Sequence, residues 1–309
     1  MGNLSFKHSG RLGDIVYSLP LIKVMAERNN SKADLYILND DYYDSARSSM
    51  KHPGEGVTVS KGLFEFIKPL LENIPYLDKV VHCAKSELPA NCIDLDSFKN
   101  QNLNLMASGN QIWYRKVFST PIPFEERWIN FKKVTESSIE TKFNIIVSKT
   151  NRYYNKAINY NFLNEVEKVG FMGLKYEYDD FVQRNNIKQV EYIPTNNAYE
   201  FALNLLSTKL FIGNQSLGFS IAEGLKIPRA VEVYEPLPVV IPIGGKCIEF
   251  IRTDQIINFI NNEFNISIKD NYPDNNMGFV ECVLTEKPQK LSKKIKNYWR
   301  AVRGKPVKN

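Results

Sequence analysis

The first 28 residues combine a short apolar segment, a loop with two glycines and an amphipathic segment, and this order constrains the fold more than any other feature. Residues 4–8 have the pattern of a strand, and residues 14–28 that of a helix. Gly10 and Gly13 permit a tight turn and a close approach of the backbone to a ligand. The helix N-terminus presents unpaired N–H groups above the sheet. The segment predicts an α/β fold with a ligand site at its first turn.

The same order of strand and helix recurs along the chain, which is typical of parallel α/β sheets. Further strands are predicted at residues 33–38, 79–83, 92–95, 143–148, 170–175, 209–212 and 230–234. Further helices are predicted at residues 63–73, 111–118, 161–168, 198–207, 218–225 and 255–264. The polar residues 40–60 indicate a loop or lid.

A chain of 309 residues exceeds the usual size of one hydrophobic core, so we expect two domains. The polar stretch 132–142 is the expected boundary between them. We therefore predict an N-terminal domain at 1–138, a C-terminal domain at 139–287 and a basic helix or tail at 288–309.

Composition favours an enzyme-sized cytoplasmic protein. No run approaches the roughly 20 apolar residues that span a bilayer, and no basic and apolar leader precedes the first strand. The four cysteines have neither the spacing of a zinc site nor the density of a disulfide framework, so free thiols are expected. The three histidines are too widely spaced to predict a histidine metal site.

Positive charge is concentrated at the end of the chain. The formal net charge is +6, and residues 288–309 contain eight lysines and arginines and no acid, so the preceding residues carry −2. Leu291, Ile295, Tyr298 and Val302 recur at helical spacing among these charges. We predict a basic amphipathic helix that packs on the protein or lies peripherally on the inner face of an anionic membrane. Nucleic-acid binding is not expected, because the basic charge is confined to one short segment.

Two motifs carry a resemblance to a known family. Gly13-Asp14 is followed by Ser18-Leu19-Pro20, and residues 211–228 contain a strand, a polar loop and a helix. Together they resemble the heptosyltransferase-like glycosyltransferases of family 9. The resemblance implies the GT-B fold, in which two Rossmann-like domains face each other across a cleft.

The resemblance implies a role for the first loop. Asp14 would be the general base that takes a proton from the acceptor hydroxyl. The acceptor would be bound by the neighbouring residues His8, Ser9, Gly10, Arg11 and Gly13. The alternative is that Asp14 only caps its helix, which also explains an aspartate at this position.

The second motif matches the family pattern in part. The family places Asp, Gly and His where this chain has Gln215, Leu217 and Ser220. A diphosphate could still be bound at the helix N-terminus by the site residues Asn214, Gln215, Ser216 and Gly218. Glu232 or Glu235, at the end of the next predicted strand, would accept ribose hydroxyls, or either is simply a solvated strand end.

Cations follow the predicted strand at 143–148. The resemblance implies a cation that neutralises the departing diphosphate, with Arg152 the first candidate and Lys149 or Lys156 the second. The alternative for each is an exposed basic loop. Asp94-Leu95-Asp96 fits a three-residue metal motif, but the simpler interpretation is a strand end, and no metal is expected.

The sequence therefore predicts a metal-independent glycosyltransferase. It would transfer a sugar from a nucleotide-sugar donor to a glycan or lipid-linked acceptor, with no cofactor beyond its substrates. One alternative is a non-catalytic glycan- or nucleotide-binding protein with the same fold, which the departures at Gln215, Leu217 and Ser220 permit. Another alternative is a sugar-nucleotide epimerase.

Overall fold

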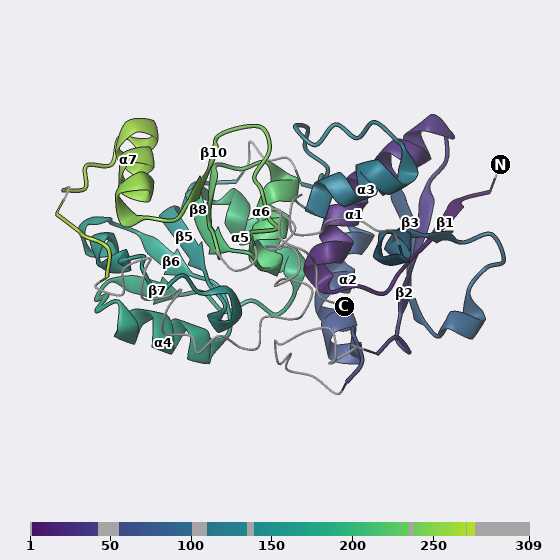
Figure 1. The fold of residues 1–309 in the computed structure, drawn as a ribbon, viewed down its shortest axis with the longest axis horizontal. Coiled ribbons are helices and arrows are strands. Elements are labelled where there is room, and N and C mark those ends of the chain that lie inside the picture. Colours follow the sequence, from purple (N-terminus) through teal and green to yellow (C-terminus); the bar gives the residue numbers. More distant parts are fainter. Residues whose placement is uncertain are drawn as a thin grey trace, which may run out of the picture.

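Two parallel β-sheets, each covered by helices, lie side by side in the computed structural model (Figure 1). The structure describes residues 2–42, 56–100, 110–134, 139–234, 238–269 and 271–275. The predicted basic helix at 288–309, residues 43–55 of the predicted lid and Glu235 lie outside these residues. Within them, no helix is both long enough and apolar enough to cross a membrane.

The first sheet has four strands in the order β3-β2-β1-β4, all parallel. Its strands are β1 (Leu4–His8), β2 (Ala33–Leu38), β3 (Leu77–Cys83) and β4 (Ile93–Asp94). Its helices are α1 (Leu12–Arg28), α2 (Lys61–Glu72), α3 (Asn110–Phe118) and the short 3-10 helices η1 (Lys85–Glu87) and η2 (Leu95–Asn100). Because the strands are parallel, the loops that follow β1, β2 and β4 meet at one edge of the sheet.

The second sheet has six parallel strands in the order β10-β9-β8-β5-β6-β7. Its strands are β5 (Phe143–Ser148), β6 (Val169–Phe171), β7 (Val190–Tyr192), β8 (Thr208–Asn214), β9 (Arg229–Glu232) and β10 (Cys247–Phe250). Its helices are α4 (Lys175–Arg184), α5 (Ala198–Leu206), α6 (Leu217–Leu225), α7 (Thr253–Phe264) and the 3-10 helices η4 (Asn151–Tyr153) and η5 (Tyr160–Glu165).

The predicted elements differ from the structure mainly between residues 160 and 192. The predicted helix at 161–168 is the 3-10 helix η5, and the predicted strand at 170–175 is the shorter β6. Gly173, with φ +158°, ends this strand segment before α4 begins. The prediction missed α4, β7 and β10, because α4 is polar and the two strands are only three and four residues long.

Helices α1, α2, α5 and α6 lie between the two sheets and pack against one another, α1 on α6 and α2 on α5 (Figure 1). One continuous hydrophobic cluster crosses this contact and includes Ile15 and Leu19 of α1, Ile67 of α2, Leu205 of α5 and Phe219 of α6. All five side chains are fully buried. The halves of the molecule therefore share a core.

The segment that joins the halves is fixed on α6. Trp128 and Ile129 both donate their backbone N–H to the Gly224 carbonyl, at 3.1 and 3.0 Å. A Cβ atom at Gly224 would lie 2.5 Å from Ile129 Cδ1, so only glycine allows this approach. The connection is thus part of the packed interior.

A buried ionic cluster closes the end of α6. Glu223 and Arg229 are fully buried and form an ion pair, and Lys226 Nζ lies 2.6 Å from Glu223 Oε1. Ile243 donates its N–H to Glu223 Oε1 (3.1 Å), and the Arg229 guanidinium donates to the Ile243 and Gly244 carbonyls. The cluster therefore anchors the loop before β10 on α6.

Lys226 predicts a pH dependence of stability. Burial lowers the pKa of Lys226 to about 8, and Glu223 opposes this shift. Between pH 8 and the ordinary lysine pKa of about 10.4, the unfolded chain binds a proton that the folded chain does not, so rising pH favours folding. We expect the free energy of unfolding, relative to Lys226→Met, to increase by about 2 kcal/mol from pH 8 to 10. Denaturant titrations of the unmodified protein and of Lys226→Met measure this difference in the free energy of unfolding. If the free energy changes equally with pH in both proteins, Lys226 is not the origin of the pH dependence.

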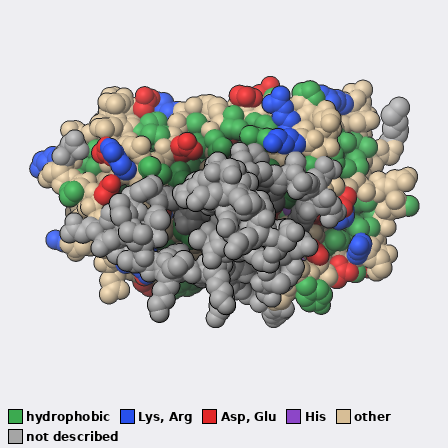
Figure 2. Space-filling view, viewed as in Figure 1, with side chains coloured by type: hydrophobic (Ala, Val, Ile, Leu, Met, Phe, Trp, Pro, Cys, Tyr) green, Lys and Arg blue, Asp and Glu red, His purple; other side chains and the backbone are tan. Residues whose placement is uncertain are grey.

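Basic and acidic side chains are interspersed on the described part of the face in Figure 2. This agrees with the near-neutral charge of the chain before residue 288.

Candidate functional site

The loop after β1 is held by its own side chains. Gly10 donates its N–H to His8 Nδ1 (2.8 Å), and a Cβ at Gly10 would lie 2.5 Å from His8 Cε1. Because the backbone N–H can only donate, Nδ1 is the acceptor and the ring proton is on Nε2. Nε2 lies 3.0 Å from the hydroxyl of Tyr114, which donates to the Asp14 carbonyl (3.1 Å). His8 is fully buried and has a structural role in this loop, while its predicted contact with an acceptor stays a prediction.

Tyr114 of α3 is a site residue that the sequence did not reveal. Burial and the nearby Asp14 and Asp96 carboxyls raise its pKa well above the ordinary value, so its hydroxyl remains a donor. It connects α3 to the first turn of α1. No local motif distinguishes this tyrosine, because the contact spans 100 residues.

Asp14 is the third residue of α1, and its side chain contributes to the N-terminal cap of the helix. Its Oδ2 accepts the Arg11 N–H at 3.2 Å, and the Arg11 side chain donates to the Thr58 carbonyl at 3.0 Å. Asp14 and Arg11 are both half-buried. The contact expected for a capping aspartate is therefore present, and it also fixes the direction of the carboxyl group.

Asp94 and Asp96 support the same loop from β4 and η2. Asp94 pairs with Lys7 (2.9 Å), and Asp96 accepts the Ser9 N–H (2.6 Å). Both aspartates therefore make structural contacts at the end of β4, as the interpretation of the motif as a strand end predicts. Among the described residues, no group of three or more His, Cys, Asp or Glu side chains is placed to hold a metal ion.

The second candidate loop surrounds the N-terminus of α6, at the end of β8. Ser216 is the N-cap residue, but its side chain caps no helix N–H, and its Oγ is buried without a hydrogen-bond partner. Thr150 Oγ1, in the loop after β5, is also buried and unpartnered. Buried hydroxyls without partners are rare in folded proteins. The Thr150 backbone is hydrogen-bonded to the Asn214 side chain, so the two hydroxyls belong to adjacent loops, and hydroxyls and the first amides of a helix are neutral donors that suit an oxyanion.

The loops after β5 and β8 are close because the two strands are neighbours. Ser148 pairs with Gly213 in the sheet, and a Cβ at Gly218 would lie 3.0 Å from Ser148 Oγ. Glycine at 218 therefore lets the start of α6 rest on the end of β5. Gly218 therefore has a packing role in this structure, and its predicted contact with the donor stays a prediction.

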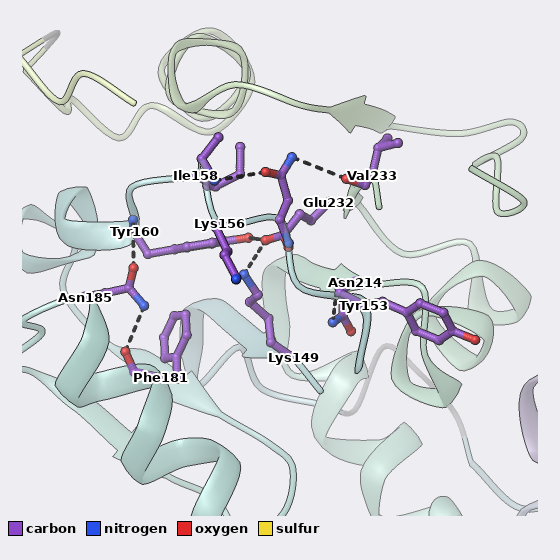
Figure 3. Close-up of polar contacts among 12 residues, drawn as sticks. Lys149, Tyr153, Lys156, Ile158, Tyr160, Phe181, Asn185, Asn214, Glu232 and Val233 are labelled. Carbon is purple, nitrogen blue, oxygen red and sulfur yellow. Dashed lines mark hydrogen bonds and ion pairs between the residues drawn. The ribbon is translucent and has the colours of Figure 1, made fainter. Parts of the chain in front are cut away.

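Lys149 and Glu232 are turned into the protein. Lys149, Tyr160 and the Asn155 N–H all contact the Glu232 carboxylate, the last two at 2.5 and 2.6 Å (Figure 3). Glu232 is fully buried and Lys149 is 3% exposed. Each charge therefore faces the other in this structure, while ribose binding by Glu232 and phosphate binding by Lys149 stay predictions.

The environment of Lys149 is strongly desolvated. Burial lowers its pKa, while Glu232 opposes the shift. Its ammonium group lies 4.1 Å from the centres of both the Tyr154 and Tyr160 rings. Tyr160 and Asn155 were not singled out from the sequence, because their only signal is their proximity to Glu232 in space.

The other predicted cations differ in exposure. Arg152 is half-buried, with its guanidinium 4.6 Å from the centre of the Tyr153 ring. Lys156 is exposed, and its carbonyl accepts a hydrogen bond from Asn275. Of the three predicted cations, Lys149 is paired with Glu232 and Lys156 is exposed, so the half-buried Arg152 remains the first candidate for the phosphate.

The two candidate loops approach each other at the start of α1 and α6. A Cβ at Gly13 would lie 3.9 Å from Ser220 Oγ, in the first turns of these helices. Ser220 donates to the Leu217 carbonyl at 2.8 Å and is fully buried. The first turn of α1, which contains Asp14, thus neighbours the first turn of α6, which follows Ser216.

Two cavities lie elsewhere in the described structure. One, of about 660 Å³, lies between α2 and β3, and the other, of about 340 Å³, lies beside the start of α7. Neither is lined by a residue that the sequence predicted for the site.

The two parallel sheets, with polar loops at neighbouring strand ends, define the GT-B architecture of glycosyltransferases. Solved structures with this fold include a family 9 glycosyltransferase from Veillonella parvula DSM 2008, with 10% identity, TM-score 0.54 and coverage of 87% of this chain and 90% of that one. They also include two proteins from E. coli. ADP-heptose lps heptosyltransferase II has 12% identity, TM-score 0.52 and coverage of 80% and 90%. The heptosyltransferase WaaC with ADP has 10% identity, TM-score 0.53 and coverage of 84% and 99%.

No protein-family model and no curated protein sequence matches the chain. At these identities the comparisons establish the fold, which is the fold that the two sequence motifs predicted.

Proposed function

We propose that the protein is a metal-independent glycosyltransferase that moves a sugar from a nucleotide-sugar to a glycan or lipid-linked acceptor. The observation that carries the proposal is the buried Ser216 hydroxyl at the N-terminus of α6, which has no hydrogen-bond partner, together with the equally unpartnered Thr150 hydroxyl in the loop that is bonded to Asn214. A nucleoside diphosphate would satisfy these hydroxyls and the first amides of the helix. The E. coli relative bound to ADP supports this choice of ligand.

The proposed donor lies against the second sheet, and the acceptor lies on the loop after β1. Asp14 takes the proton of the acceptor hydroxyl, whose oxygen attacks the anomeric carbon of the donor. The bond between that carbon and the diphosphate oxygen breaks, and the diphosphate leaves with the electron pair. Arg152, the α6 amides and the two hydroxyls stabilise the charge that develops on it. The neighbouring positions of Gly13 and Ser220 support a transfer between these two loops.

The donor site is tested by thermal shift with ADP, UDP, GDP and CDP and with their sugars. We expect one nucleotide to raise the melting temperature, since a ligand at 100 times its Kd adds about 2.7 kcal/mol of stability. For a chain of this size that is a shift of about 5 °C. Thr150→Val should reduce the shift. Ser31→Ala, which removes another unpartnered buried hydroxyl in the first half, should leave it unchanged.

A turnover assay with the same nucleotide-sugars and added acceptors separates the enzyme from a binding protein of this fold. Release of nucleoside diphosphate that depends on an added acceptor supports transfer. Binding without turnover supports the binding protein, and a complete lack of nucleotide shifts would overturn the donor site.

A further inference from the structure

The loop after β5, which carries Arg152, is held by a buried side chain from the neighbouring strand β8. Asn214, the last residue of β8, is fully buried. Its Nδ2 donates to the carbonyls of Thr150 and Tyr153, at 2.7 and 2.9 Å, and its Oδ1 accepts the Thr150 N–H at 3.3 Å. Figure 3 shows Asn214 beside Tyr153. Asn214 therefore fixes this loop, while its predicted contact with the donor stays a prediction.

A second buried side chain, Glu177, reaches the same loop from the opposite side. It is the third residue of α4, which follows β6, and it is 6% exposed. Its Oε2 accepts the Leu174 N–H at 3.1 Å, and its carboxyl group also accepts the backbone N–H of Asn151 in η4. A Cβ at Gly173 would lie 3.3 Å from Glu177 Oε2, so glycine leaves room for the carboxyl group. Because β5 lies between β6 and β8 in the sheet, Glu177 and Asn214 hold the loop between them.

The burial of Glu177 is more than a helix cap requires. Glu87 makes the same capping contact in η1, where it accepts the Ala84 N–H at 2.7 Å, and Glu87 is exposed. Glu177 makes this contact with Leu174 and in addition turns to a different loop. A buried carboxylate is costly unless other groups compensate its charge. The compensating groups therefore indicate what the glutamate is for.

Two of the groups that stabilise the Glu177 carboxylate belong to the loop after β5. Burial raises the pKa of Glu177, and the N–H groups of Leu174 and Asn151 and the charge of Arg152 oppose this shift. The attraction between two opposite charges is mutual. The carboxylate therefore stabilises the Arg152 guanidinium in its place beside α4.

We propose that Glu177 is a positioning residue, which fixes the loop after β5 through the Asn151 N–H and holds the Arg152 guanidinium in place for an anionic ligand. This inference rests on the proposed function and adds a residue that acts on the donor through Arg152. A long arginine side chain loses rotamer freedom when it binds a ligand, and a neighbouring carboxylate that already restricts it lowers this cost.

A double-mutant cycle tests whether Glu177 acts through Arg152. Glu177→Gln removes the charge and keeps an oxygen that accepts an N–H. The probe is the nucleoside diphosphate with the largest thermal shift, and calorimetric titration measures its Kd for the unmodified protein, Glu177→Gln, Arg152→Met and the double variant. We expect Glu177→Gln alone to raise the Kd about tenfold, and to change it by less than about twofold when Arg152→Met is present.

The cycle distinguishes positioning from a merely structural role. If Glu177 only supports the fold, Glu177→Gln raises the Kd by the same factor with and without Arg152, which would overturn the inference. An unchanged or lower Kd in Glu177→Gln would also overturn it.

Glu177→Met tests the contact with Asn151, because methionine has a similar length and no acceptor oxygen. The matched control is Glu87→Met, which removes the third residue of η1 and its capping contact. Without nucleotide, we expect faster hydrogen exchange at residues 151–153 in Glu177→Met, and unchanged exchange there in Glu87→Met and Glu177→Gln. Unchanged exchange in Glu177→Met would show that the contact does not fix the loop. If Glu177→Met does not fold, the cycle with Glu177→Gln decides the inference.

Failure of the proposed function and failure of this inference give different results. If the unmodified protein binds none of the four diphosphates, the proposed function fails and the inference fails with it. If it binds one and the cycle shows no coupling between Glu177 and Arg152, only the positioning role is wrong.

Discussion

Asp14→Asn is expected to lower sugar transfer by about 10²–10⁴-fold while leaving the fold and the nucleotide Kd unchanged. The asparagine retains an oxygen that can accept the Arg11 N–H, so the contact that caps α1 is preserved. What it lacks is a basic oxygen for the proton of the acceptor hydroxyl. The measurement is the acceptor-dependent release of nucleoside diphosphate, together with a nucleotide titration.

The substitution separates the two interpretations of this residue. Glu27→Gln, a change of an exposed carboxylate on the same helix, is the control and should have full activity. If Asp14→Asn is equally active, Asp14 is a helix cap and the base must be sought elsewhere. If Asp14→Ala is unstable while Asp14→Asn is stable and inactive, Asp14 both caps the helix and acts as the general base.

Lys149→Met is expected to destabilise the protein by about 3–5 kcal/mol, because it leaves the Glu232 carboxylate buried without its cation. For a chain of this length the melting temperature should fall by about 6–10 °C. Lys156→Met, in the same loop but exposed, should change it by less than about 1 °C. Thermal unfolding of the three proteins measures the difference.

The double variant Lys149→Met with Glu232→Gln identifies the cause. A neutral amide removes the uncompensated charge, so we expect much of the lost stability to return. If the double variant is as unstable as the two single changes added together, the ion pair contributes little and packing explains the loss.

The fold could be predicted because its determinants are local. Apolar strand segments such as 4–8 and 143–148, and the spacing of helices between them, indicate a parallel α/β sheet without knowledge of distant contacts. The short strands β7 and β10 could not be predicted. Three or four residues have too little periodicity, and these strands are formed by pairing with β6 and β9.

The positions of the candidate site residues in the fold could be predicted from the sequence, and their roles stay predictions. Residues 8–14 and 214–218 do lie at strand ends, which a parallel sheet requires. The sequence could not show that Glu232 and Lys149 neutralise each other, since they are 83 residues apart. Nor could it show that Asn214 is directed at Thr150, because the direction of a side chain at a strand end depends on the neighbouring loop.

Because α1, α2, α5 and α6 share one hydrophobic core, we do not expect either half of the chain to fold alone or to be exchanged easily for a half of another protein. Either half produced alone would present an apolar helix pair to water, which favours aggregation over an independent domain. A half grafted from a protein of the same fold would have to reproduce the packing of Leu19 and Phe219 as well as its own ligand site. A single substitution at a half-buried residue of the strand-end loops, such as Arg152, changes a candidate ligand contact without touching this shared core.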